Sequence, residues 1–553
     1  MCEAVATRWR VESFGSNSGG QLGVASNEDK YSPTPNQFMQ HDANNIFSSL
    51  ISVPVCFYRE ADSKPPVIVG GGNHSLLYWE DLPFVFGCGT FDDGELPLPD
   101  RLERLSKSVS VWRRLTIPVE EGDNSLNMDE LNGSGKCSSC KKLTFRVKQI
   151  TAGWNHTLLL SSTGKVYCCG SNSYGQCGFI KSLYPKIDVF TRVSIKENFE
   201  ELKVVKLSSG LRHNLALTSK GFVYGWGSNS RSQLTGGGTS ASASASASVS
   251  ATLKKPNRTL LDKIVFEPRR INLADNVIDI SCGRYHSSWL SSESSIDSPS
   301  EAGTGELFST KSEKQKDLVL CVVGRSDVTD YISKSVLGNV SGLKFASIKL
   351  GILLGQVNCN FESIKLKSSW DNLFVATNTL NTEEVGSTNK PSRVFNVYGI
   401  GSNKFRMLGE SPSAAEANDQ AEHSPANKLG KNTELAVEPV VSLNVCSSLG
   451  ISSSFVCGSY HAIALGGNGH AVCWGWNEHG NCSCSSCESV WPPNLIAIPE
   501  DPGYDDTSHR PNPQSIALPQ PPSCCQRSTD RPLAPYHQSR DLELAAALAI
   551  YGQ

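Results

Sequence analysis

The sequence has no apolar run near the roughly 18 to 20 residues that a membrane-spanning helix needs. Its first ten residues, MCEAVATRWR, contain no apolar core of the kind found in a secretory signal peptide. It also has little excess charge of either sign, because 51 Lys and Arg stand against 54 Asp and Glu and give a net charge of −3. Direct nucleic-acid binding usually requires a basic excess. These absences predict a protein without a membrane span or direct nucleic-acid binding, in the cytoplasm and with the nucleus as a further compartment.

Motifs for covalent or nucleotide chemistry are also missing. The sequence contains no G-x-x-x-x-G-K-[ST] phosphate loop and no G-x-S-x-G nucleophile turn. Ser, His and Asp are abundant but form no sequence cluster that indicates a nucleophile and its base. We therefore expect no covalent enzyme chemistry and no cofactor.

The 19 cysteines do not form a disulfide framework. Without a signal peptide, single cysteines inside apolar runs predict buried thiols in a reducing compartment. These cysteines are Cys56, Cys282, Cys321 and Cys457.

Two C-x-x-C pairs, Cys137 with Cys140 and Cys484 with Cys487, could together form a tetrahedral zinc site. The pairs lie far apart in the sequence, in loops of different repeat units, and Cys484 and its partner are flanked by serines. We expect surface cysteines and no bound metal.

What the sequence does contain is an internal repeat, and its 47 glycines with only 19% charged residues favour a turn-rich β protein. The first repeated pattern is Gly-x-x-His, placed between two apolar stretches. It reads GGNH at 71–74, GWNH at 153–156, GLRH at 210–213, GRYH at 283–286 and GSYH at 458–461. A worn copy, SWDN, occupies residues 369–372.

The second pattern begins with glycine and usually has a small residue five positions later. It reads GSNSGGQL from Gly15, GTFDDGEL from Gly89, GSNSYGQC from Gly170, GSNSRSQL from Gly227, GSNKFRML from Gly401 and GWNEHGNC from Gly475. A copy near Gly324 keeps only the first glycine. Between the two patterns, Gly164, Gly221 and Gly469 stand where a hairpin turn requires a positive φ, and short alternating strands follow them.

Repeated units of a few short strands joined by glycine turns are typical of a β-propeller. The combined pattern resembles the repeat of the regulator of chromosome condensation family over about residues 8–500. The resemblance implies an all-β fold, a seven-bladed β-propeller with six blades as the alternative. Flexible insertions are expected at about 236–260, 291–316 and 410–440, where small or polar residues dominate. Residues 503–553 are expected to form a disordered, proline-rich tail in which 541–550 (DLELAAALAI) could form a short helix.

The two ends of the repeat region carry half units. The sequence opens with G-S-N-x-x-G-Q-L and its last glycine pattern has no Gly-x-x-His strand after it. A ring with this phase would close by pairing strands from both ends of the chain in one blade, which removes an exposed sheet edge.

The last unit, with CWGWNEHGNC at 473–482 followed by VWPP at 490–493, narrows the resemblance. It is similar to the group that contains the secretion-regulating guanine nucleotide exchange factor and the fungal alpha-tubulin suppressors. The resemblance implies a protein-binding regulator, monomeric, and a candidate exchange factor for a small GTPase linked to secretion or traffic. The alternative is a non-catalytic adaptor of the tubulin-suppressor type, linked to microtubules or to complexes that modify tRNA or translation factors. We find no segment that indicates a wedge hairpin of the chromosome regulator's type.

The repeated residues are interpreted as structural, because one histidine per blade at one position spreads around the ring. They are Gly71, His74, Gly153, His156, Gly210, His213, Gly283, His286, Gly458 and His461. The predicted partner-binding residues replace the usual S-N-x-x-G-Q of the second pattern, and the acidic ones are suited to compete with phosphate for a basic loop of a GTPase. They are Asp92, Asp93, Glu95, Glu478 and His479. Of Trp9, Trp226, Trp474 and Trp476, which lie beside or near repeat glycines, most are expected in the core.

Overall fold

Short strands, most of them in antiparallel pairs, are the main regular structure in the part of the chain that the structure describes. The computed structural model describes residues 4–39, 47–48, 50–54, 65–99, 107–118, 145–234, 263–272, 274–292, 318–337, 345–350, 361–381, 392–409, 441–442, 452–466, 471–485, 488–496 and 547–551. Residues 1–496 and 544–553 belong to one compact unit, and a second unit, 497–543, lies outside the described residues.

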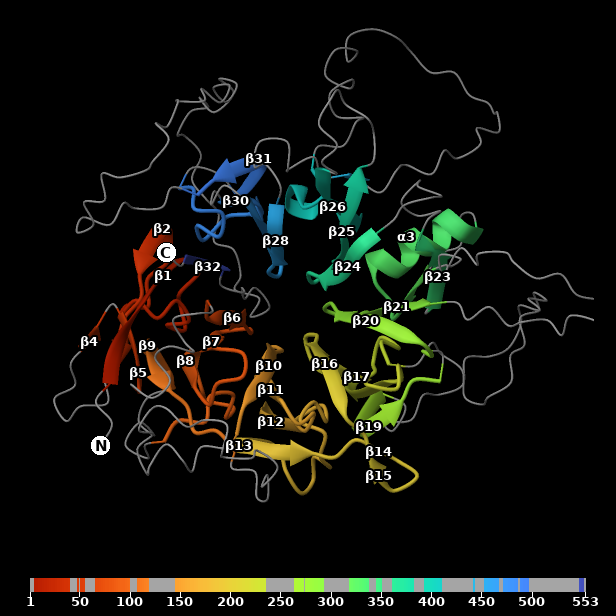
Figure 1. Ribbon diagram of the computed structural model, residues 1–553, viewed down its shortest axis with the longest axis horizontal. Helices are drawn as coiled ribbons and strands as arrows, with labels where there is room; N and C mark the ends of the chain where they lie inside the picture. Colours follow the sequence, from red (N-terminus) through yellow and green to blue (C-terminus); the bar gives the residue numbers. More distant parts are fainter. Residues whose placement is uncertain are drawn as a thin grey trace, which may run out of the picture. The chain divides into compact units, whose positions relative to one another are not determined.

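Six blades of four strands each, named here blades I to VI, are arranged in a ring around a central axis (Figure 1). Blade I contains β6 (Val67–Gly70), β7 (His74–Tyr78), β8 (Val85–Thr90) and β9 (Ser108–Arg114); blade II β10 (Val147–Ala152), β11 (His156–Ser161), β12 (Val166–Ser171) and β13 (Lys186–Val193); blade III β16 (Val204–Ser209), β17 (His213–Thr218), β18 (Val223–Ser228) and β19 (Ile264–Arg270). Blade IV contains β20 (Val277–Cys282), β21 (Ser287–Ser292), β22 (Leu318–Val323) and β23 (Phe345–Lys349); blade V β24 (Phe361–Ser368), β25 (Asn372–Asn381), β26 (Ser392–Gly401) and β27 (Val441–Ser442); blade VI β28 (Ser452–Cys457), β29 (His461–Gly466), β30 (Ala471–Trp476) and β31 (Ser489–Leu495). The predicted all-β propeller is confirmed, with six complete blades among the described residues.

A further, incomplete sheet lies between blades VI and I (Figure 1). Its centre is β1 (Ala4–Gly15), which pairs with β2 (Lys30–Pro35), β5 (Leu50–Pro54) and β32 (Ala547–Tyr551). On the side of blade I, β3 (Phe38–Met39) pairs with β9 and with β4 (Phe47–Ser48). The first and last described strands of the chain therefore share one sheet, although the last strand comes from the predicted tail and not from the repeat region.

The strand β32 corrects the prediction of a short helix at 541–550. Arg10 to Phe14 of β1 pair with Tyr551 to Ala547 of β32. The leucines and alanines of this segment favour a helix, but an isolated helix this short is marginal in water. Pairing along the open edge of β1 instead satisfies backbone hydrogen bonds on both strands, so tertiary context overrides the local preference. The rest of the predicted tail, 503–546, lies outside the described residues.

The two middle strands of a blade are buried on both faces because a neighbouring blade covers each face. Every residue of β11, β12, β17 and β18 is buried. One apolar cluster runs through blades II, III and IV and includes Leu158, Leu215 and Trp289. The expected core tryptophans Trp226, Trp474 and Trp476 are buried.

The first glycine of the second pattern allows the third strand of a blade to pass beside the loop of the first pattern. Gly170 has φ +112°, and a Cβ there would lie 2.4 Å from the carbonyl oxygen of Asn155. The copy near Gly324, which keeps only the first glycine of the second pattern, has the same geometry. Gly324 has φ +115°, and a Cβ there would lie 2.2 Å from the carbonyl oxygen of Tyr285. The hairpin glycines Gly164 and Gly221 have positive φ as predicted, whereas Gly469 lies outside the described residues.

A second close contact inside the blades is made by two alternative residue pairs. In blade III a Cβ on Gly225 would lie only 2.8 Å from Leu234 Cδ2. In blade II cysteines take both positions, and Cys168 and Cys177 are fully buried next to each other. The Gly–Leu pair recurs as Gly87–Leu96 and Gly399–Leu408, and the Cys–Cys pair recurs as Cys473–Cys482. Volume removed at one position is thus added at the other, which keeps the packing density of the blade.

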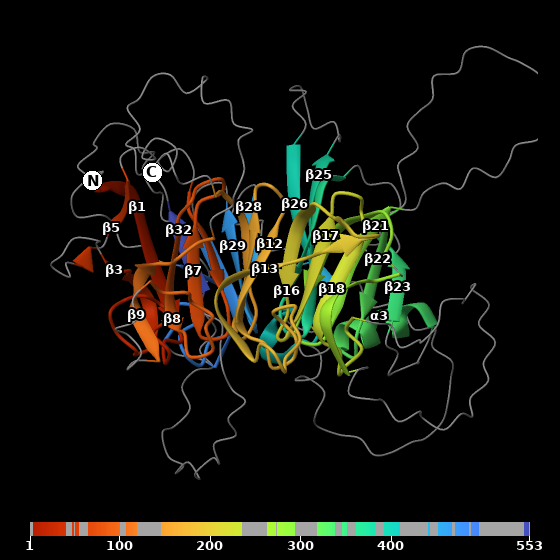
Figure 2. The ribbon, with the colours of Figure 1, turned by 90° about the horizontal axis from the view of Figure 1, so that it is seen from below.

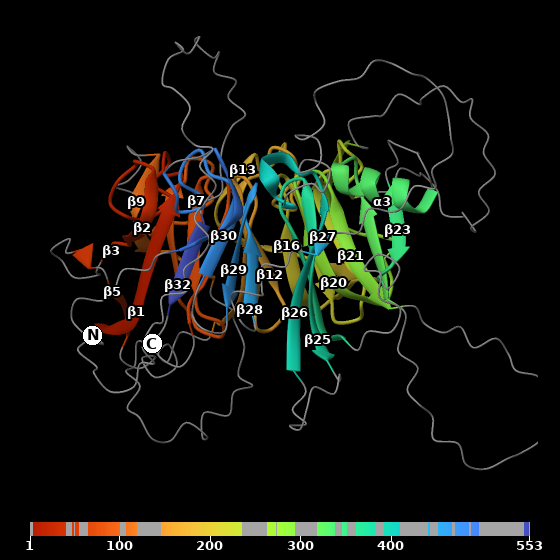
Figure 3. The ribbon, with the colours of Figure 1, turned by 90° about the horizontal axis from the view of Figure 1, so that it is seen from above.

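The three predicted insertions lie outside the described residues, except for Ser291 and Ser292 at the end of β21. Each separates two strands that pair within one blade, namely β18 from β19, β21 from β22 and β26 from β27. The helix α3 (Asp327–Leu337) follows β22 at one face of the ring, and β25 and β26 extend beyond the other strands at the opposite face (Figures 2 and 3). Among the described helices, none has the length and hydropathy needed to cross a bilayer.

The closing strand makes a first prediction. Replacing Ala549→Pro together with Ile550→Pro removes two consecutive backbone N–H groups of β32, of which antiparallel pairing uses one toward β1. We expect the thermal unfolding midpoint to fall by a few degrees, since a lost ladder bond costs about 1 kcal/mol. Ala517→Pro in residues 497–543 is the matched control, and equal midpoints for the two proteins in differential scanning calorimetry would contradict the closure.

Candidate protein-binding surfaces

The Gly-x-x-His loops meet around the central axis at one face of the ring, called here the mouth. The innermost strand of each blade runs toward the mouth and ends in this loop, which is closed by a backbone bond from the glycine N–H to the histidine carbonyl, 2.9 Å long at Gly153. A Cβ on Gly153 would lie 2.0 Å from His156 Cε1 and 2.7 Å from the carbonyl oxygen of Gly210 in the next blade. Glycine is therefore required by close packing of its own histidine and of the neighbouring loop.

The SWDN copy of the first pattern, at 369–372, achieves the same close packing with different residues. Ser369 takes the glycine position and Asn372 the histidine position. The Ser369 hydroxyl donates to Asn372 Oδ1 at 3.2 Å, and the backbone bond that closes the loop, Ser369 N to Asn372 O, is kept at 3.0 Å. The shorter asparagine side chain leaves the space that the serine Cβ and hydroxyl need.

The five repeat histidines are buried, and two of them, His74 and His156, bond to the neighbouring blade. His156 Nε2 donates to Asn214 Oδ1 of blade III at 2.8 Å, and His74 Nε2 lies 3.0 Å from Thr157 Oγ1 of blade II. Burial lowers the pKa of each imidazole, to about 3 for His74 and His213 and to about 4 for His156, His286 and His461. At neutral pH all five rings are uncharged parts of the framework.

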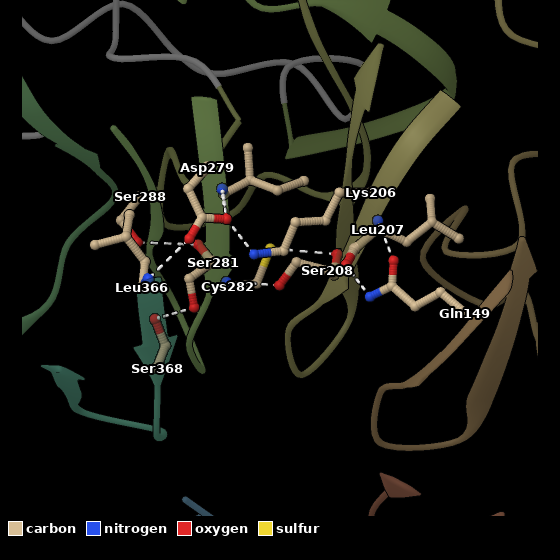
Figure 4. Close-up of polar contacts among 11 residues, drawn as sticks. Gln149, Lys206, Leu207, Ser208, Asp279, Ser281, Cys282, Ser288, Leu366 and Ser368 are labelled. Atoms are coloured by element: carbon tan, nitrogen blue, oxygen red, sulfur yellow. Dashed lines mark hydrogen bonds and ion pairs between the residues drawn. The ribbon is translucent and has the colours of Figure 1, made fainter. Parts of the chain in front are cut away.

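Polar side chains also join the innermost strands of neighbouring blades (Figure 4). The Gln149 amide accepts from Leu207 N and donates to Leu207 O, both at 2.9 Å, so it bridges β10 and β16 as a peptide group would. Asp279 forms an ion pair with Lys206 of β16 and accepts from Leu366 N of β24 at 2.8 Å. The polar side chains of the innermost strands named here are thus used in structural contacts between blades.

Of the predicted partner-binding residues, Asp92, Asp93 and Glu95 lie in the mouth-side loop of blade I. Asp92 is exposed and forms an ion pair with Lys107 at 3.2 Å, whereas half-buried Asp93 accepts a hydrogen bond from Asn155. Glu95 is only 2% exposed, and its carboxylate accepts from Asp93 N at 2.9 Å and from Thr90 Oγ1 at 2.8 Å.

The position of Glu95 corrects its assignment to a binding surface. Its contact with the backbone two residues earlier is the one that the repeat glutamine makes in other blades. The equivalent bonds are Gln21 Oε1 with Gly19 N, Gln176 Oε1 with Tyr174 N and Gln233 Oε1 with Arg231 N. Burial raises the pKa of Glu95, and the residue belongs to the framework of its loop.

Glu478 and His479 lie in the mouth-side loop of blade VI, across the incomplete sheet from Asp92. Glu478 is exposed. His479 Nδ1 lies 2.7 Å from Asp29 Oδ2 of the loop after β1, and its ring packs edge-on against Trp476 at 5.6 Å. His479 thus fastens blade VI to the closing sheet, and the structure does not gather the five predicted residues into one site.

Aromatic side chains that the sequence analysis did not assign to a site cover the mouth. Trp154 and Trp370 contact each other with ring centroids 5.8 Å apart, although blades II and V are not neighbours. Trp370 packs 5.4 Å from Tyr460, and Phe405 lies 5.2 Å from Tyr460 and 5.4 Å from Trp476. The sequence places Trp154, Trp370 and Tyr460 in the two variable positions of the Gly-x-x-His pattern, which form the tips of the inner loops. Aromatic residues at these positions could have indicated this surface.

A cavity of ≈ 180 Å³ lies at the mouth, where the two tryptophans are part of its lining. It is lined by loop glycines, by serines such as Ser209 and Ser368, and by the thiols Cys282 and Cys457. It is smaller than the roughly 300–1,000 Å³ of typical ligand pockets. The mouth is therefore better suited to surface contacts than to enclosing a substrate.

A short hairpin lies between blades II and III. Strands β14 (Lys196–Glu197) and β15 (Glu200–Glu201) pair around a two-residue turn, Asn198 and Phe199, in which both residues have positive φ. Phe199 is 99% exposed. Because β13 runs back from the mouth, this hairpin lies at the opposite face. Its two-residue strands are too short to appear as a strand pattern in the sequence.

Cysteines and metal ligands give a partial answer to the earlier expectations. Cys282 and Cys321 are buried free thiols and Cys457 is a half-buried one. Cys484 is half-buried, whereas Cys56, Cys137, Cys140 and Cys487 lie outside the described residues. Within the described ranges, no three His, Cys, Asp or Glu side chains gather as metal ligands.

This protein is a β-propeller, part of which consists of regulator of chromosome condensation repeats. Two sequence profiles described as the regulator of chromosome condensation (RCC1) repeat match it, one at 147–176, 204–233 and 453–481 and the other at 163–217 and 220–290. The family resemblance that the motifs predicted is thus confirmed.

Individual relatives match only part of the chain. The secretion-regulating guanine nucleotide exchange factor of Bos taurus is 31% identical over 233 residues, 42% of this chain and 38% of that protein. The ultraviolet-B receptor UVR8 of Arabidopsis thaliana is 28% identical over 257 residues, 42% of this chain and 52% of the receptor. The matches thus span about half or less of these relatives.

Solved structures support the fold over most of the chain. Prp20p from Saccharomyces cerevisiae superposes with a TM-score of 0.52 at 17% identity, covering 90% of this chain and 87% of Prp20p. Human WBSCR16 gives a TM-score of 0.51 at 18% identity, with 89% and 94% covered. At this identity the likeness establishes the propeller and not an activity.

The packing of the mouth loops makes a second prediction. Gly283→Ser places a Cβ where His286 Cε1 lies at 2.1 Å, and we expect it to lower the free energy of unfolding by about 1–3 kcal/mol. The pair Gly283→Ser with His286→Asn copies Ser369 and Asn372 and is expected to recover stability. Urea unfolding of both single variants and the double variant gives the coupling free energy, and additive effects would contradict the compensation.

The neutral histidines make a third prediction, about acid stability. Their folded-state pKa values lie below the usual 6.5, so the unfolded chain binds more protons and stability falls as pH falls from about 6.5 toward 4. His286→Asn is expected to reduce this slope by up to about 1.4 kcal/mol per pH unit. Urea unfolding between pH 6.5 and 4.5 measures it, with His509→Asn in residues 497–543 as control, and an unchanged slope would refute the neutral state.

Proposed function

We propose that this propeller is a protein-binding regulator, and that it acts as a guanine nucleotide exchange factor for a small GTPase linked to secretion or traffic. The observation that carries the proposal is the hairpin β14–β15 with its exposed Phe199. The name of the secretion-regulating exchange factor, a partial relative, supports the choice of activity.

Phe199 combines two unfavourable features at one residue. Full exposure forgoes the roughly 1.5–3 kcal/mol that burial of a large apolar side chain provides. Its φ of +70° is also strained for a bulky residue. Such features persist at functional sites, and burial in a partner would offset the first of them.

The charges of the hairpin suit contact with a basic phosphate-binding loop. Glu197 is held by Arg270 at 2.7 Å and Glu201 by Arg192, so the strands are anchored to blades III and II. Glu200 at the tip is exposed beside Phe199. A carboxylate at this tip can compete with nucleotide phosphate for the same cations, while Phe199 binds an apolar surface next to it.

Exchange requires no covalent chemistry by the propeller. A factor that binds the nucleotide-free GTPase more tightly than the loaded form shifts the equilibrium toward release by that difference in affinity. The hairpin fulfils this requirement better than the loop of Asp92 and Asp93, whose carboxylates are already paired with Lys107 and Asn155.

The fourth prediction tests the hairpin. Release of labelled GDP from a panel of purified small GTPases is measured with the full chain and its variants. We expect Phe199→Ala to slow release from the responding GTPase about tenfold or more, whereas Tyr184→Ala, which changes another exposed aromatic residue, leaves the rate unchanged. Asp92→Ala with Asp93→Ala tests the blade I loop in the same assay.

The assay distinguishes exchange from adaptor function. Acceleration that survives Phe199→Ala would remove the hairpin from the mechanism. If no GTPase in the panel responds while protein partners co-purify stably, exchange is refuted and the adaptor function is favoured.

A further inference from the structure

A row of cations lies over the aromatic side chains of the mouth, at the face opposite the hairpin. Arg212 lies 4.4 Å from the ring centre of Tyr174, Arg231 lies 5.2 Å from Tyr285, and Arg284 lies 4.8 Å from Trp370. On blade V, Lys404 lies 4.7 Å from the ring centre of Phe405 and 5.7 Å from that of Tyr460. We call Arg212, Arg231, Arg284 and Lys404 the cation row; they come from the loops of blades III, IV and V.

The cation row has no carboxylate partner among the described residues. Elsewhere in the described chain, cations such as Lys206 and Arg270 form ion pairs with Asp279 and with Glu197 and Asp275. In the row, the aromatic faces hold the cations in place. The Arg284 side chain also hydrogen-bonds Tyr460, while its buried Nε has no partner. A stacked, fixed guanidinium is well suited to bidentate contacts with carboxylates.

The carboxylates at the mouth, in contrast, are largely engaged. The Tyr460 hydroxyl donates to Asp371 Oδ2, and burial together with this aspartate raises the pKa of Tyr460. Asp93 accepts from Asn155, and Asp29 contacts His479. The positive charge of the row is therefore left for a group outside the described residues.

We propose that the cation row and the aromatic mouth beneath it form a docking site for an acidic segment of a protein partner. Carboxylates of that segment pair with the four cations, and its apolar groups lie against Trp154, Trp370 and Phe405. This surface is separate from the hairpin β14–β15 and does not depend on exchange activity.

The chemistry favours an acidic peptide over nucleic acid. A nucleic acid carries a phosphate at every nucleotide and would bring some of these charges close to Asp371 and Asp92 at the same mouth. A peptide can place its few carboxylates over the row and avoid these residues.

The fifth prediction uses fluorescence anisotropy with the full chain. The probe is a short labelled peptide of alternating glutamate and serine, and the same peptide with glutamine is its uncharged control. We expect the glutamate peptide to bind more tightly, and Arg231→Gln with Arg284→Gln to weaken it about tenfold. Arg269→Gln, an exposed cation of β19 away from the mouth, is the matched control and should leave affinity unchanged.

Four outcomes would overturn the docking site. These are equal binding of the glutamine peptide, equal losses in the Arg269 control and the double variant, tighter binding of labelled oligothymidine, and self-association abolished by the double variant in sedimentation velocity. The third would assign the surface to nucleic acid, and the fourth would assign it to a second copy of the chain. GDP release stays unchanged in the double variant, so failure of this proposal is separate from failure of the exchange proposal.

Discussion

The ring depends on one constraint, the close approach of the backbone of neighbouring loops at the mouth. At Gly153, the space of a Cβ is already filled by the ring of His156 and by the carbonyl oxygen of Gly210 in the next blade. The same arrangement at Gly71 and Gly210 links the loops of blades I to IV. Because each loop touches the next, backbone contact sets the spacing of the loops around the axis of the ring. The variable side chains of the loops project beyond these contacts and form the aromatic mouth.

Two pair replacements show that this constraint acts on contacts and not on single residues. Serine with asparagine replaces glycine with histidine at Ser369 and Asn372, and cysteine with cysteine replaces glycine with leucine at Cys168 and Cys177. In both cases one side chain grows and its neighbour shrinks. A sequence pattern that requires glycine at each repeated position would not recognise the units that contain these pairs. Their packing is nevertheless the same as in the units that keep the glycine.

Much of the fold could be predicted from the sequence, since glycines at fixed offsets report backbone geometry directly. Gly170 and Gly324 occupy the same left-handed conformation although the second belongs to a unit with almost no other recognisable residue. The failures have a common cause. The strand Ala547–Tyr551 and the hairpin at Asn198 and Phe199 are formed by contacts with distant or opposing chain segments, and local residue preference carries little information about them.

The candidate site was predicted less well than the fold for a related reason. Acidic residues in the second pattern looked unusual, but Glu95 simply replaces a glutamine that holds its own loop. The residues that differ most in surroundings, Trp154, Trp370 and the cations near them, stand in the positions that the repeat leaves variable. The variable positions of a repeat determine the surface that distinguishes one propeller from another. Only a structure shows which of these positions lie side by side.

The two faces of this propeller differ in the kind of group they present. One presents cations supported by aromatic rings, and the other presents a Phe at the tip of an acidic hairpin. A ring with two such faces can hold one partner on each side without competition between them.

The pairing of β1 with β32 has a consequence for synthesis of the chain. During synthesis, the edge of β1 that will receive Ala547–Tyr551 is made long before its partner, because the two segments lie far apart in the sequence. All six complete blades can assemble while this edge is still open to pairing with another chain. Until Ala547–Tyr551 has been made, this edge stays unpaired and open to association with other chains, and a protein truncated before this segment would keep the edge exposed.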